Sequence, residues 1–225
     1  MSFRYDIALA AKMVEASYDL FDRNPDPNNS LIPHIKGKLD RNDVQAAYLT
    51  NGVLLIPGSN SIKDYAKFNL RVLNFGGRKF RLNDTLTQKW GSNVTWHQGF
   101  LHHAKVVADW LRRNGFRPKY VIGHSLGAAA TQILVRTHDI HGIAFAAPRV
   151  TRGTAIPPPA SKCLCLNRLD DSVCDLPSSF QHLGNIHVGE GDRKFLRFDH
   201  KMARYREMVA AQQAGGHLGT HWPPR

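Results

Sequence analysis

Apolar residues recur along the chain at the spacing of helices that bury one face. From Ile7 to Tyr18 they are four, three and four positions apart, and the segment from Phe100 to Leu111 repeats this spacing. Leu126 to Thr137 and Tyr205 to Ala211 also have helical patterns. Ser61 to Asp64 has the form of a capping box, which predicts the start of a further short helix.

Short apolar runs between these segments are typical of buried strands. Two of them flank Asn51-Gly52, a dipeptide that tolerates positive φ, and together they predict a β-hairpin. The predicted strands are Ala46–Thr50 and Val53–Ile56 in the hairpin, followed by Lys119–Ile122, Gly142–Ala146 and Lys162–Asn167.

The alternation of these strands with helices predicts an α/β fold. We expect a mostly parallel central sheet with helices on both faces. Pro157-Pro158-Pro159 cannot lie in a sheet and predicts a surface connection. We expect one domain over residues 1–225, in which 212–225 form a flexible tail.

Composition narrows the class of protein. Of the 225 residues, 42% are hydrophobic and 21% are charged, which is typical of a globular chain. No stretch approaches the roughly 20 apolar residues of a membrane span. The first residues lack a signal-peptide pattern, so we expect a cytoplasmic protein, with non-classical export left open. The three cysteines, an odd number, predict reduced thiols.

The chain is basic. It has 30 Lys and Arg against 18 Asp and Glu, which gives a net charge of +12. Such a surface attracts anionic partners, and peripheral contact with an anionic membrane is one possibility. No zinc-finger, RNA-recognition or Walker motif accompanies the charge, so nucleic-acid binding is not favoured.

The most informative motif is Gly123-His124-Ser125-Leu126-Gly127, a G-x-S-x-G pattern between a predicted strand and a predicted helix. A nucleophilic serine on a tight strand-to-helix turn leaves room only for glycine two residues before and two residues after it. The motif therefore predicts Ser125 as the nucleophile of an acyl-transfer reaction.

Beyond this motif, the sequence resembles the class 3 lipases, the fungal-lipase-like branch of the α/β-hydrolases. The likeness covers most of the chain, and the segments that carry it are Ile56–Ser59, Asp64-Tyr65, Trp96–Phe100, Gly123–Ala129, Ala144–Val150, Asp171–Pro177 and Phe198–Tyr205. The resemblance implies a single-domain α/β-hydrolase fold and hydrolysis of lipid esters.

The resemblance also implies an oxyanion hole. Its donors would be the backbone N–H of Leu126 and the N–H or hydroxyl of Ser59. Pro57 stands where the family usually has arginine, so the loop before Ser59 departs from the family pattern. The family can carry a lid between Asn74 and Thr95, but no amphipathic helix is evident there, and we expect a short lid or none.

A serine nucleophile needs a histidine base and an acid that orients it, and in this fold they follow in the order Ser, Asp or Glu, His. The resemblance to an Asp-x-Val-x-x-Leu-Pro segment implies Asp171 as the acid. Asp170 remains the alternative, because a shift of one residue would exchange the two.

Five histidines follow Asp171 in the sequence. His200 resembles the family's late histidine before a helix that bears tyrosine, and it is our candidate base. The others fit less well. His182 is close in sequence to the acid, His187 alternates with Ile186 and Val188 in a predicted strand, and His217 and His221 lie in the predicted tail. We expect His97 and His124 to pack and form hydrogen bonds near the serine.

These residues predict a triacylglycerol lipase or carboxylic ester hydrolase with the triad Ser125, Asp171 and His200. The mechanism calls for no metal or cofactor, and the partner is a lipid or small ester substrate. A phospholipase, thioesterase or acyltransferase could use the same triad. An alternative of another class is a non-catalytic basic adaptor on an anionic membrane.

Overall fold

The fold is described from a computed structural model of the chain. It describes residues 4–58, 72–75, 78–81, 87–89, 94–152, 162–190 and 200–224. The predicted helix at Ser61–Asp64, the connection at Pro157–Pro159 and the oxyanion candidate Ser59 lie outside these ranges.

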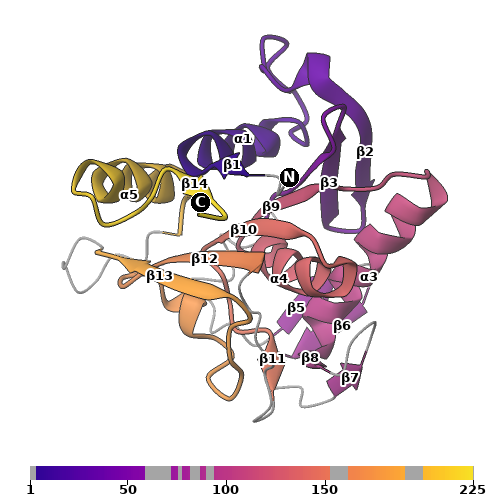
Figure 1. Cartoon of the computed structure of the whole chain (residues 1–225). Coiled ribbons are helices and arrows are strands. Elements are labelled where there is room, and N and C mark those ends of the chain that lie inside the picture. Colours follow the sequence, from indigo (N-terminus) through magenta and orange to yellow (C-terminus); the bar gives the residue numbers. More distant parts are fainter. Residues whose placement is uncertain are drawn as a thin grey trace.

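The core of the molecule is a mixed, mostly parallel sheet of seven strands in the order β13-β12-β10-β9-β4-β3-β2 (Figure 1). The five strands from β13 to β4 are parallel, and β3 and β2 complete the sheet as antiparallel strands. Their bounds are β2 Ile35–Arg41, β3 Val44–Leu49, β4 Val53–Ile56, β9 Tyr120–His124, β10 His141–Phe145, β12 Cys163–Arg168 and β13 Asn185–Gly189. The predicted α/β fold is confirmed.

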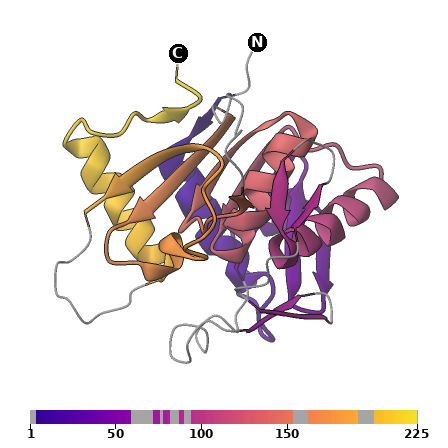
Figure 2. The same ribbon diagram turned by 90° about the horizontal axis from the view of Figure 1, so that it is seen from below.

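Helices cover both faces of this sheet. Figures 1 and 2 place α1 and α5 side by side on one face and α3 and α4 on the other. The strands allow this because successive side chains point to opposite faces: Leu54 packs with α3 and α4, whereas Leu55 packs with α1 and α5. The helices are α1 Ile7–Asp19, α3 Gln98–Arg113, α4 Leu126–His138 and α5 Met202–Ala214, with 3-10 turns at Ile32–His34 and Ser172–Asp175.

Within the ranges described above, short strands form three smaller sheets. The described parts of 74–95, where the family can carry a lid, lie mostly in such strands. These strands are β1 Tyr5–Asp6 with β14 His221–Trp222, β5 Val72–Phe75 with β6 Arg78–Arg81, and β8 Thr95–His97 between β7 Thr87–Lys89 and β11 Thr151–Arg152.

Strand β2 is absent from the sequence predictions. Only Leu39 of its seven residues is buried, so an edge strand of this kind has almost no hydrophobic pattern. Its turn into β3 uses Asn42 and Asp43, which both have positive φ. Asn and Asp adopt positive φ more readily than most residues. The Asn42-Asp43 dipeptide was therefore the one sequence feature that could have indicated a hairpin here.

The C-terminal segment differs from the flexible tail predicted over 212–225. Residues 212–214 end α5, and β14 pairs with β1 next to the start of the chain. The Tyr120 hydroxyl donates to the Trp222 carbonyl at 2.9 Å, and the Trp222 side chain is buried. Weak local propensity is thus overridden by long-range packing. No helix in the described ranges is long and apolar enough to cross a membrane.

Candidate active site

The site is built on the turn between β9 and α4. Ser125 is the one residue between them, and its backbone has φ 58° and ψ −117°, a conformation that costs strain outside glycine. The flanking glycines are required by space. A Cβ at Gly127 would collide with the carbonyl oxygen of Ile56 at the end of β4, and one at Gly123 would collide with the carbonyl oxygen of Gly127. The turn predicted from the motif is therefore present.

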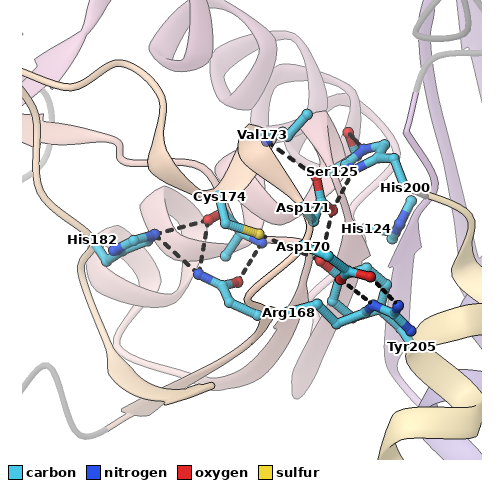
Figure 3. Close-up of polar contacts among 12 residues, drawn as sticks. His124, Ser125, Arg168, Asp170, Asp171, Val173, Cys174, His182, His200 and Tyr205 are labelled. Carbon is cyan, nitrogen blue, oxygen red and sulfur yellow. Dashed lines mark hydrogen bonds and ion pairs between the residues drawn. The ribbon is translucent and has the colours of Figure 1, made fainter. Parts of the chain in front are cut away.

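His200 and Asp171 meet Ser125 at this turn (Figure 3). The Ser125 Oγ lies 2.6 Å from His200 Nε2, and His200 Nδ1 lies 2.6 Å from Asp171 Oδ2. A carboxylate only accepts, so Nδ1 carries the proton and donates to Asp171. Nε2 is then the acceptor of the Ser125 hydroxyl.

The carboxylate of Asp171 is held by further donors. The Val173 backbone N–H donates to Oδ1 at 3.1 Å, and the Tyr205 hydroxyl donates to Oδ2 at 2.6 Å. Burial and nearby Cys174 and Asp171 raise the pKa of Tyr205 well above its usual value, so this phenol stays a donor. These contacts fix the carboxylate of Asp171 in an almost fully buried position.

Asp170 has a different partner. Its two carboxylate oxygens accept from the Arg168 guanidinium at 2.9 and 2.7 Å, and Arg168 also donates to the Arg204 carbonyl in α5. The geometry therefore brings Asp171 to His200 and Asp170 to Arg168.

The other late histidines have contacts elsewhere. His182 lies 2.9 Å from the Ala147 carbonyl, and His187 lies 3.3 Å from the Gln212 side chain. His217 and His221 are exposed. Among the described residues, no group of His, Cys, Asp and Glu gathers as a metal ion would need.

The two early histidines lie in different places, His97 at the start of α3 and His124 directly before Ser125. His97 is fully buried and accepts from the Phe100 N–H at the start of α3. The ring of His124 lies beside that of His200, with 4.9 Å between centroids. Burial and the neighbouring His200 hold the pKa of His124 well below its usual range, so it is neutral.

Of the two candidate oxyanion donors, Leu126 lies within the described residues. Leu126 is the first residue of α4, where helix N–H groups point outward and favour negative charge. Ser59 is outside the described residues, but its neighbour Gly58 lies against Ser125: a Cβ there would be 3.0 Å from the Cβ of Ser125. Gly58 in turn donates its N–H to the hydroxyl of Tyr18, a contact that no sequence pattern indicated.

Comparison with family models of proteins and with curated proteins finds no match. Among solved structures, the chain is similar to the nonglycosylated Lip2 lipase of Yarrowia lipolytica, with 14% identity, a TM-score of 0.54 and coverage of 84% of this chain and 82% of that one. Lipase II of Rhizopus niveus gives 17% identity, a TM-score of 0.51 and coverage of 80% and 77%. The chain has the α/β-hydrolase fold of the fungal lipases.

A third similar structure is a triacylglycerol lipase in which a serine protease triad forms the catalytic centre. It is 16% identical, with a TM-score of 0.50 and coverage of 80% of this chain and 78% of that one. In the present α/β-hydrolase fold, Ser125 follows β9, Asp171 follows β12 and His200 follows β13. All three lie beyond the carboxyl ends of parallel strands, where this fold class binds its ligands.

Proposed function

We propose that the protein is a serine hydrolase of carboxylic esters, a lipase or esterase that acts on acylglycerols or similar lipid esters through an acyl-enzyme on Ser125. The observation that carries the proposal is the continuous set of hydrogen bonds from Ser125 through His200 to Asp171. The lipase names of the structural neighbours support the choice of an ester substrate.

The mechanism follows from the protonation pattern of the triad. His200 Nε2 takes the Ser125 proton while the serine oxygen attacks the ester carbonyl, and Asp171 stabilises the resulting imidazolium. The N–H of Leu126 and the N–H or hydroxyl of Ser59 bind the oxyanion. His200 then gives its proton to the departing alcohol. Water, deprotonated by His200, releases the acid and restores Ser125.

The triad does not determine which leaving group the enzyme releases or which acceptor takes the acyl group. A phospholipase, a thioesterase and an acyltransferase all use the same acyl chemistry, and they differ in the alcohol, thiol or acceptor. A panel of triacylglycerol, phospholipid and thioester substrates separates them.

The first test is turnover of p-nitrophenyl esters of increasing acyl length by the wild type, Ser125→Ala and Ser17→Ala. Ser17 is a matched control, because it is also fully buried but donates only to the Val14 carbonyl within α1. We expect Ser125→Ala to lose at least about 10³-fold in kcat and Ser17→Ala to stay within about twofold.

Two results would contradict the proposal. Wild-type turnover that survives Ser125→Ala would mean another nucleophile. A folded wild type that neither turns over esters nor reacts with a fluorophosphonate probe would favour the non-catalytic adaptor.

A further inference from the structure

The hydroxyl of Tyr18 lies at a junction between three parts of the site. Tyr18 is in the last turn of α1. Its oxygen accepts the N–H of Gly58 at 2.8 Å, on the segment after β4, and lies 2.6 Å from Nδ1 of His124, the residue before the nucleophile. Gly58 and Ser125 are themselves in close approach.

The direction of these hydrogen bonds follows from the groups involved. Burial raises the pKa of the Tyr18 phenol above its usual value, so the hydroxyl keeps its proton. The N–H of Gly58 can only donate, so the Tyr18 oxygen accepts it, and we assign the phenol proton to Nδ1 of His124. Neutral His124 therefore carries its own proton on Nε2.

Both contacts bear on the proposed reaction. Gly58 directly precedes Ser59, the candidate oxyanion donor, so the Tyr18 contact fixes the start of that loop. His124 lies beside His200, as Figure 3 shows, and a neutral ring there adds no repulsion when His200 becomes an imidazolium.

We propose that Tyr18 is a positioning residue for ester hydrolysis, whose hydroxyl fixes the backbone at Gly58 and the tautomer of His124 around Ser125 and His200. This role rests on the proposed function. With this role, α1 contributes to catalysis although it supplies none of the three triad residues. Tyr18 acts through Gly58 and His124 and does not touch the reacting atoms.

The test compares Tyr18→Phe with Tyr48→Phe on p-nitrophenyl butyrate. The control also loses one hydroxyl contact, from Tyr48 to the Arg117 carbonyl, at the opposite end of the parallel strands. We expect Tyr18→Phe to lower kcat at least about tenfold, because small misplacements of catalytic groups are costly, with KM within about twofold and Tm close to that of the control.

A double-mutant cycle with His124→Leu separates positioning from general loosening. Both variants lose the contact between Tyr18 and His124, whereas only Tyr18→Phe loses the contact to Gly58, so the double variant should lose less kcat than the product of the two single losses. Losses that multiply would overturn the proposal, as would a Tyr18→Phe variant that keeps the kcat of Tyr48→Phe or loses activity only as its folded fraction falls.

The activity of the wild type distinguishes a failure of the proposed function from a failure of the proposed role of Tyr18. Wild-type turnover with unchanged Tyr18→Phe overturns only the role of Tyr18. A folded wild type without turnover or fluorophosphonate labelling overturns the proposed function and this role together.

Discussion

Two adjacent aspartates have different environments in this protein. Asp171 accepts hydrogen bonds from His200, Tyr205 and the Val173 N–H, whereas Asp170 forms a bidentate ion pair with Arg168. Asp170 lies in the turn that follows β12, whereas Asp171 has extended backbone angles at the start of the next 3-10 turn, and the two side chains reach different partners. A shift of one residue along the chain would exchange the two aspartates, so their exact positions decide which one contacts His200.

Asparagine substitutions should separate the two. Asp171→Asn places an amide donor toward Nδ1 of His200 and favours the wrong tautomer, and we expect a loss in kcat on the order of 10³ to 10⁴. Asp170→Asn should leave kcat within about threefold but lower the free energy of unfolding by about 2 to 4 kcal/mol, because buried Arg168 loses this ion pair. Steady-state kinetics and urea unfolding of both variants measure this. The reverse pattern would assign the acid to Asp170.

At the scale of elements, the turn between β9 and α4 depends on how closely α4 approaches the end of β4. The first turn of α4 leaves no room for a side chain at Gly127, where a Cβ would meet the carbonyl oxygens of Ile56 and Pro57. This contact is between backbones, so it cannot be relieved by rotating a side chain.

We therefore expect Gly127→Ala to cost at least about 3 kcal/mol of stability and to lower activity, because α4 must move away from β4. Gly219→Ala is the matched control, since a Cβ there meets nothing within 4 Å, and it should change stability by less than about 0.5 kcal/mol. Thermal and urea unfolding give both values. A Gly127→Ala variant as stable as the control would contradict the tight packing.

At the scale of the whole molecule, helices on both faces of the sheet bury several histidines in neutral form. The clearest is His103 in α3, which is 1% exposed and whose pKa is lowered by burial from 6.5 to about 4. Burial also lowers the pKa of His182. The unfolded chain binds protons at these sites below pH 6.5 while the folded chain does not, so stability falls as the pH falls from about 6.5 toward 4.

For His103 alone, we expect a loss of about 2 kcal/mol of unfolding free energy between pH 7.5 and pH 5. Urea unfolding at both pH values tests this, and His103→Gln should reduce the difference because its amide does not titrate. If wild type and His103→Gln have the same pH dependence, the histidine is not held neutral by the fold.

The sequence predicted the main elements because their hydrophobic patterns are strong. The helix over Ile7–Tyr18 and the strand before Gly123 carry enough apolar residues to be recognised alone. Strand β2 was missed because an edge strand buries little. The segment predicted as a flexible tail contains β14, which local patterns did not indicate because it pairs with distant partners, including Tyr120.

For the candidate site, the sequence by itself determined the tight turn at Ser125, because two glycines around a serine express a local steric demand. It also indicated Asp171 and His200 through their order and motifs, with Asp170 left open. Only the tertiary structure decided which carboxylate faces His200 and that Tyr18 reaches His124. Tyr18 and His124 are 106 positions apart, and such contacts depend on how helices pack on the sheet, which local sequence patterns do not encode.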